Sequence, residues 1–555
     1  MAGLMVRPVL EESSTADETV FLGAGYSYWL GHRYYLNCEH PPLMQLWSAL
    51  PLLCQNIETP PHTAFYFDCQ HPLTETRTWD GRTVSFDSIF RDGIDSYYYP
   101  FAESRRFGDW LVYGGKNDAT RVLFSGRLMQ ILITLTVGLV VFGWARSLAG
   151  NVGGLLALIT WGFNPVALAF GHLVGTDPGI TLFLVLTVWM WSRFLENPNG
   201  RHAVFAGLAL AAALLTKFSA IVLLPTIILL WAIAWWQHRK DTQHQSWLKK
   251  SMVGMVVCVV VAWALVWLVY FPMWAPPPAI DVARAELLGV PHWWRFCHWA
   301  LIPREYFKGL GIVFAHSKAG HPAYLLGSWS VLGWWYYFPA ALFFKTPLAL
   351  LLLIGLAFIL AGKQVRGSTL AKLAPAVAVV VYLAIAMTSH INIGIRHVLP
   401  VYALFAVMIG VWCGSAGARI RLVACGFAGA LVIVALLAQP YYLEYFNEYC
   451  GGAADGYKYL VDSNLDWGQD ALRLKQFVDR HRIDHVYLDA TYSAITGKYY
   501  KMNQTTVDGA SARSLTNAWL VVSGSRLVQP EWNWLRERYS PSATLANSTF
   551  IYQIP

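Results

Sequence analysis

Residues 251–271 have the sequence SMVGMVVCVVVAWALVWLVYF, a run of 21 residues without a charged side chain. A helix needs about 20 apolar residues to cross roughly 30 Å of hydrocarbon, so this run is long enough to span a membrane. Lys249 and Lys250 immediately precede it. Basic residues collect at the cytoplasmic ends of membrane helices. The stretch therefore predicts a membrane helix that starts on the cytoplasmic side.

Similar apolar runs occur along most of the chain, and they predict ten membrane helices in all. Their central stretches contain no Asp, Glu, Lys or Arg. The fourth run is short. The predicted spans are residues 127–146, 151–171, 178–195, 202–217, 220–237, 251–271, 346–362, 373–389, 397–413 and 421–438.

The composition of the whole chain agrees with a polytopic α-helical membrane protein. Of its 555 residues, 56% are hydrophobic and only 13% are charged, whereas a soluble domain has roughly 25% charged residues. The chain also contains 26 Trp, and its mean hydropathy is +0.40. These values exclude a soluble enzyme, a disordered chain and a basic protein that binds nucleic acid, and they make the lipid bilayer an obligatory partner.

The Lys and Arg residues between the spans are sorted to one side, which predicts the orientation. Alternate connections hold twelve basic residues against two acids, Glu196 and Asp241. The opposite short connections hold Lys217 and Arg396, with Asp177 as their acid. The basic connections are predicted to be cytoplasmic, and the protein to be multi-pass in the plasma (inner) membrane.

This orientation divides the chain into five regions. Residues 1–126 form a first extracytoplasmic loop with juxtamembrane helices and an acidic motif. Residues 127–271 form an N-terminal transmembrane module, 272–345 a large extracytoplasmic loop, and 346–438 the C-terminal transmembrane helices. Residues 439–555 are predicted to form a small extracytoplasmic α/β domain. Apolar and polar residues alternate along 485–489 and 518–522, as in β-strands, and 472–481 has the pattern of an amphipathic helix.

The start of the chain is unusual for this arrangement. The loop pattern places Asp17 outside, yet the first 120 residues contain no clear membrane span. We expect that the chain begins within the loop after a missing first helix, which would give eleven spans. Cys54 and Cys69 lie in this outer region, where they could form a disulfide that closes the loop.

Ionisable residues collect at the predicted outer ends of the spans, although the segments that carry them are far apart in sequence. On the predicted topology all of them face one compartment. They are Asp17, Glu18, Glu39, His40, Asp177, Lys217, Arg396 and His397.

Each of these residues also has a structural interpretation. Asp177 could cap the helix it begins, or interact only with the helix dipole. Lys217 and Arg396 could extend to lipid headgroups, and an acidic pair such as Asp17 and Glu18 is usually solvated. The convergence of acids and bases at one membrane surface favours a functional site, because buried or interfacial charges in membrane proteins are costly.

This mixture of charges suits transfer of a group from a lipid phosphate to a hydroxyl. A hydroxyl acceptor needs a carboxylate base to take its proton. A phosphate leaving group needs fixed positive charge where its negative charge develops. Residues His40, Lys217, Arg396 and His397 are expected at the level of the lipid headgroups and are predicted to bind the donor phosphate.

Several motifs resemble the protein O-mannosyltransferase superfamily, which includes the bacterial aminoarabinose transferases. They are Asp17-Glu18, Glu39-His-Pro-Pro-Leu43, Thr176-Asp177 and Leu215-Thr-Lys-Phe218. The later segments 337–347, 392–400 and 462–469 are similar to a bacterial branch of phospholipid carrier-dependent glycosyltransferases. The resemblance implies a GT-C membrane fold, glycosyltransferase family 39-like, and transfer of a sugar from a polyprenyl-phosphate donor with inversion on the outer face.

The resemblance also implies roles for individual residues. Asp17 acts as base or orients the acceptor, and Glu18 belongs to the same catalytic motif. Asp177 is the catalytic acid at the outer start of a later span. Glu39 corresponds to an active-site glutamate that can bind a divalent metal in some relatives. His40 corresponds to the residue that contacts the donor phosphate. Residues 439–555 differ from the protein O-mannosyltransferase tail, which has an extracellular repeat domain. This difference leaves the acceptor open among a protein, a lipid and a glycan.

Two other functions use the same donor chemistry. A transporter or flippase for a lipid-linked saccharide usually carries ionisable groups or broken helices near the membrane midplane, which the sequence does not show. A polymerase or ligase that joins whole saccharide chains differs only in donor and acceptor size. The sequence therefore favours a single-sugar transferase over a transporter or flippase. It does not distinguish a single-sugar transferase from a polymerase or ligase.

Overall fold

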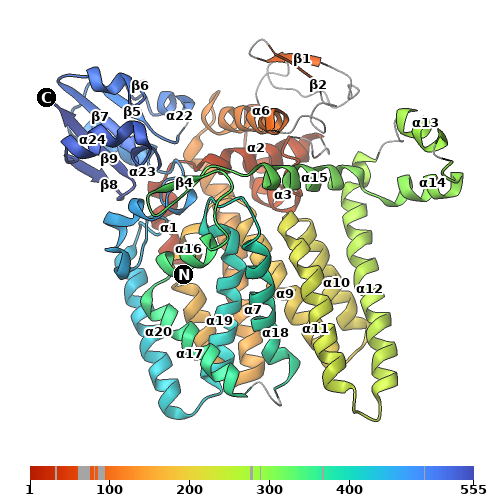
Figure 1. Ribbon diagram of the computed structural model, residues 1–555. Coiled ribbons are helices and arrows are strands. Elements are labelled where there is room, and N and C mark those ends of the chain that lie inside the picture. The colour runs from red at the N-terminus through yellow and green to blue at the C-terminus, as the bar shows by residue number, and fades with distance from the viewer. Residues whose placement is uncertain are drawn as a thin grey trace.

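The computed structural model describes residues 1–31, 34, 36–59, 76–79, 82–85, 94–274, 279–287, 289–364, 368–492 and 494–555. Long helices run side by side in a bundle, further helices lie across one end of it, and a sheet-containing unit sits beside that end (Figure 1). Cys69, the predicted disulfide partner of Cys54, lies outside the described residues.

Helices occupy all ten ranges in which membrane spans are predicted. The bundle consists of α7 (Ala119–Gly162), α8 (Pro165–Gly171), α9 (Asp177–Glu196), α10 (Gly200–Leu214), α11 (Leu223–His238), α12 (His244–Tyr270), α17 (Leu348–Gln364), α18 (Leu370–Ala386), α19 (Leu399–Gly414) and α20 (Ala418–Ala438). Helix α7 breaks at Gly150, whose φ of 68° suits glycine. Beyond the break the chain folds back, so that Leu158 and Trp161 lie against Gly138.

The helices have the lengths and compositions of a polytopic membrane protein. Within the described ranges, six helices are long and apolar enough to cross a membrane, or seven if the bent pair α16 (Tyr337–Lys345) and α17 is one span. This count takes the whole of α7 as one helix, and it classes α10 and α18 as shorter apolar helices. The polytopic helical architecture is confirmed, whereas the number of ten spans stays a prediction.

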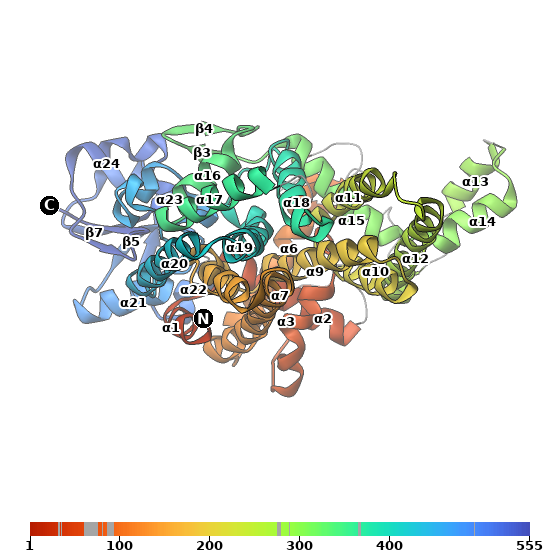
Figure 2. The same ribbon diagram turned by 90° about the horizontal axis from the view of Figure 1, so that it is seen from below.

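Helix α19 forms the centre of the bundle (Figure 2), and each of its residues is buried. It packs against α7, α9, α17 and α18. Helices α12 and α20 differ, because each buries only a narrow stripe and exposes large apolar side chains such as Val256 and Leu437. A helix that is apolar all round yet exposed on one face is typical of a protein surrounded by lipid.

A layer of helices covers the end of the bundle where α9 begins (Figure 1). It contains α2 (Ala16–Gly31), α3 (Leu43–Ala49), η1 (Leu50–Cys54), α6 (Ile94–Tyr113) and α15 (Arg304–Ala319). Helices α2 and α6 cross closely at Gly108, where a Cβ would lie 2.1 Å from the carbonyl oxygen of Thr19. The short helix α1 (Ala2–Glu11) packs against α7 and α8. Beside α12 lie α13 (Ala279–Leu287) and α14 (His292–Leu301).

The last part of the chain folds around a five-stranded sheet in the order β6-β5-β7-β9-β8. Strand β5 (Val486–Asp489) runs parallel to β6 (Gln504–Thr506) and β7 (Ala518–Ser523), while β9 (Thr549–Ile554) is antiparallel to β7 and β8 (Ala543–Leu545). The predicted strands at 485–489 and 518–522 are thus present. The predicted amphipathic helix is also present, as α21 (Ala471–Arg480).

Candidate functional site

Four of the predicted site residues form one chain of ion pairs at the covered end of the bundle. Arg396 Nη1 lies 3.0 Å from Asp17 Oδ2 and 3.8 Å from Asp177 Oδ2. Lys217 Nζ lies 2.6 Å from Asp177 Oδ1. The four side chains are between 6% and 20% exposed, and their two positive and two negative charges balance.

Each of these residues stands at a helix end or in a break between helices. Asp17 is in the first turn of α2, and Asp177 is the first residue of α9. Lys217 is extended, with φ −155° and ψ 138°, between α10 and the 3-10 helix η2 (Phe218–Val222). Arg396 lies in η4 (Ile395–Val398), directly before α19. The carboxylates therefore interact favourably with helix N-termini, but their ion pairs go beyond capping.

Two histidines lie close enough to this cluster to sense its charges. Burial, helped by the positive charges of Lys217 and Arg396 and opposed by Asp177, lowers the pKa of His40 to about 3. His40 is therefore neutral at physiological pH, with its ring edge-on to Phe21 at 5.0 Å. Among the described residues, neither His40 Nδ1 nor His397 Nε2 has a hydrogen-bond partner, although both atoms are buried. Such atoms are costly unless a ligand or water satisfies them.

Two more ionisable residues belong to this region and were not predicted. Burial, helped by the negative charge of Asp17 and opposed by Arg396, raises the pKa of Asp462 to about 6. Asp462 also has a left-handed backbone, with φ 59°. Burial lowers the pKa of His321, Arg396 adds to this shift, and Asp17 opposes it. His321 Nδ1 lies 3.2 Å from His316 Nε2. Asp462 lies in the quoted segment 462–469, whereas no sequence signal indicates His321.

Glu18 lies apart from the ion-pair chain, although it is adjacent to Asp17 in sequence. Its side chain is fully buried, and its two oxygens accept from Arg127 Nε at 2.9 Å and Nη2 at 2.7 Å. They also accept from the backbone N–H groups of Thr15 and Val174. Both oxygens of this carboxylate are therefore engaged by protein donors. These contacts hold the segment before Asp17 in place, and the catalytic role of Glu18 stays a prediction.

The predicted metal site at Glu39 finds no set of ligands. In the part of the chain that the structure describes, no three side chains of His, Cys, Asp or Glu are placed to hold a metal ion. Glu39 is half-buried in the turn that precedes Pro41. A divalent metal needs several oxygen or nitrogen ligands around it. The described residues thus provide no ready-made set of three protein ligands around Glu39. The metal site at Glu39 stays a prediction, and no step of the chemistry below uses a metal.

Comparison with known families tests the resemblance that the motifs suggest. Residues 107–269 match the family model described as dolichyl-phosphate-mannose-protein mannosyltransferase. The predicted resemblance to this mannosyltransferase family is confirmed. The matched segment runs from α6 into α12 and contains Asp177 and Lys217, while Asp17 and Arg396 lie outside it.

Two solved structures are similar to the chain. They are the crystal structures of ArnT from Cupriavidus metallidurans, one bound to undecaprenyl phosphate and one in the apo state. The first has 10% sequence identity and a TM-score of 0.48, and the second 11% and 0.46. The similar regions cover 99% of this chain in both cases, and 96% and 95% of the ArnT chains. No curated protein matches the sequence.

Proposed function

We propose that the protein is an inverting glycosyltransferase of the plasma membrane, which moves a sugar from a polyprenyl-phosphate donor to a hydroxyl acceptor on the outer face. One observation carries the proposal: the Asp17 carboxylate lies 3.0 Å from the Arg396 guanidinium, within a neutral chain of two acids and two bases. This set of ion-paired side chains lies at one end of the apolar helix bundle. The match to a family described by a lipid-phosphate sugar supports the donor class.

The arrangement supplies both halves of the reaction. The acceptor oxygen attacks the anomeric carbon while Asp17 takes the hydroxyl proton. The bond between that carbon and the phosphate oxygen breaks on the opposite face of the sugar, which inverts the configuration. The phosphate leaves with the electron pair, and Arg396 and Lys217 stabilise its negative charge.

The same ion pairs also suggest how the donor would be held. A phosphate placed here competes with Asp17 and Asp177 for the same guanidinium and ammonium groups, so donor binding frees the carboxylates. His40 and His397 fit this role because a neutral imidazole still donates one N–H. Their buried ring nitrogens without a partner among the described residues point to a bound polar group at this place.

The test uses purified protein in lipid nanodiscs and a panel of polyprenyl-phosphate sugars with protein, lipid and glycan acceptors. We expect wild-type protein to release polyprenyl phosphate and form a product one sugar heavier than the acceptor. A product heavier by a whole saccharide chain would favour the polymerase or ligase. Movement of labelled lipid across vesicles without a new glycosidic bond would favour the transporter.

A further inference from the structure

The loop Asp462–Asp470, which precedes α21, contacts both the segment before Asp17 and the Arg396 side chain. On one side it pairs with the segment before Asp17. The N–H of Ala16 donates to the Trp467 carbonyl at 2.8 Å, and the N–H of Ser13 donates to the Gln469 carbonyl at 3.0 Å. The Ser13 hydroxyl donates to the Gly468 carbonyl at 3.0 Å. These bonds fix the backbone from which Asp17 projects.

On its other side the same loop holds Arg396. The Arg396 guanidinium carbon lies 4.1 Å from the centre of the Trp467 ring. Arg396 Nε donates to Ser463 Oγ at 3.2 Å, and Ser463 Oγ donates to the Ile393 carbonyl at 2.7 Å. A Cβ at Gly394 would lie 2.1 Å from Ser463 Oγ, so this contact requires a glycine there. Backbone and side chain of the arginine segment are thus both held.

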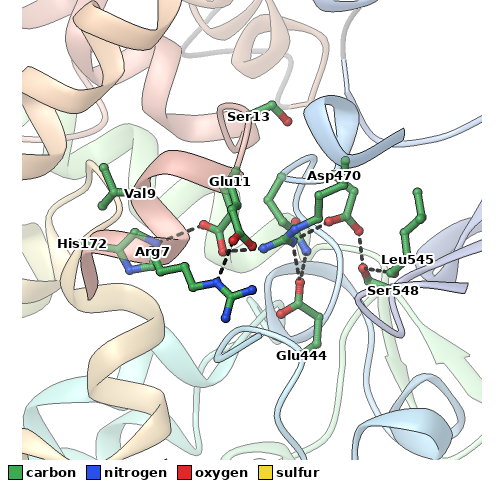
Figure 3. A network of polar contacts seen from close by, with 12 residues as sticks. Arg7, Val9, Glu11, Ser13, His172, Glu444, Asp470, Leu545 and Ser548 are labelled. Atoms are coloured by element: carbon green, nitrogen blue, oxygen red, sulfur yellow. Dashed lines mark hydrogen bonds and ion pairs between the residues drawn. The ribbon is translucent and has the colours of Figure 1, made fainter. Parts of the chain in front are cut away.

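A buried polar network holds the end of the loop at Asp470 (Figure 3). Arg473 of α21 binds Asp470 at 2.6 Å and Glu12 at 3.3 Å, and Glu12 also lies 3.0 Å from His172 Nε2. Asp470 accepts from the hydroxyls of Ser548 and Thr549 in the sheet unit. The network therefore joins the N-terminal segment, the end of α8 and the last strand to one loop.

We propose that Trp467 and Ser463 are positioning residues of the site, which hold the Arg396 guanidinium between Asp17 and Asp177 and thereby strengthen binding of the sugar-phosphate donor. An arginine side chain has several rotatable bonds, and ordering it costs conformational entropy. The ring of Trp467 covers one guanidinium face and Ser463 takes Nε, which leaves the Nη groups for carboxylate or phosphate. This inference rests on the proposed function, because it assigns Arg396 to the donor phosphate.

The test compares Trp467→Ala with Trp467→Phe in nanodiscs. We expect Trp467→Ala to raise the donor KM, and the Kd for polyprenyl phosphate alone, about tenfold through the lost cation–π contact. We expect a smaller change in kcat, and Trp467→Phe to restore most of the affinity. Trp534→Ala is the control, because Trp534 lies in α24 (Asn533–Arg538) of the sheet unit and its indole N–H donates to the Gly509 carbonyl.

A double-mutant cycle separates positioning from general damage to the fold. If Trp467 acts through Arg396, then Trp467→Ala has no further effect in the Arg396→Ala background. An equal loss in that background, or an equal loss from Trp534→Ala, would overturn the inference. If wild-type protein binds polyprenyl phosphate but forms no product, the proposed function fails and the cycle is judged on binding alone. If it binds no polyprenyl phosphate, both fail.

Discussion

Arg396 donates from Nη1 to Asp17 Oδ2 over 3.0 Å, although 379 residues separate the two in the chain. The contact joins the start of α2 to the turn before α19, and it places a carboxylate and a fixed positive charge side by side. A base and an electrophilic stabiliser must be this close to act on one reacting centre.

Asp17→Asn is expected to lower kcat by a factor of about 10² to 10⁴, because an amide cannot take the proton from the hydroxyl group of the acceptor substrate. The protein should still fold and bind polyprenyl phosphate. Transfer is measured from a radiolabelled lipid-linked sugar. Glu11→Gln is the control, since Glu11 is a more exposed acid of the same segment that also pairs with an arginine, Arg7. Wild-type rates in Asp17→Asn would remove Asp17 from the chemistry.

Arg396→Lys is expected to lower kcat/KM by about one to two orders of magnitude although it keeps the charge. The planar guanidinium of Arg396 contacts Asp17, Ser463 and the Trp467 ring at the same time. A lysine ammonium lacks this planar fork and cannot make all three contacts. Steady-state kinetics with varied donor would show the effect chiefly in KM. The exposed substitution Arg7→Lys should change neither constant. A fully active Arg396→Lys would mean that charge alone suffices.

Glu18→Gln is expected to lower the free energy of unfolding by about 3–5 kcal/mol, because it leaves the buried Arg127 charge without its counter-ion. Thermal unfolding in detergent measures the loss. Arg127→Met should have a similar effect, and the double variant should cost much less than the sum of the two. Full stability with abolished transfer in Glu18→Gln would instead support the catalytic role predicted from sequence.

Acidification is expected to destabilise the protein through His40. Its pKa is about 3 in the folded state, chiefly because of burial, and about 6.5 in the unfolded chain. Below pH 6.5 the unfolded state therefore binds a proton that the folded state does not. Its stabilising contribution is complete above pH 6.5 and is lost as pH falls towards 3, at up to about 1.4 kcal/mol per pH unit.

The measurement is the unfolding midpoint of wild type and His40→Gln between pH 7 and pH 4.5. The variant should lose part of the decline that wild type shows at low pH. His481→Gln, which changes an exposed histidine at the end of α21, should decline like wild type. Identical curves for wild type and His40→Gln would show that His40 is not held neutral by the fold.

The sequence alone predicted the helices and the residues at their ends. The run 251–271 determines a helix wherever it is placed, because apolar length and the absence of charge are local properties. Asp177 and Lys217 could be assigned to one surface since each stands at the end of such a run. The strands β5 and β7 also followed from local alternation.

The partners of those residues were decided by the tertiary structure. Neighbours in sequence separated: Asp17 joined Arg396, whereas Glu18 turned to Arg127, 109 residues away. Trp467 and Ser463 lie in the quoted segment 462–469, but nothing in that segment indicates that they support an arginine. Whether a charge becomes a buried counter-ion or a reactive group depends on which helix ends meet and how much water they exclude. Membrane spans follow from local composition, whereas the site depends on contacts between segments hundreds of residues apart.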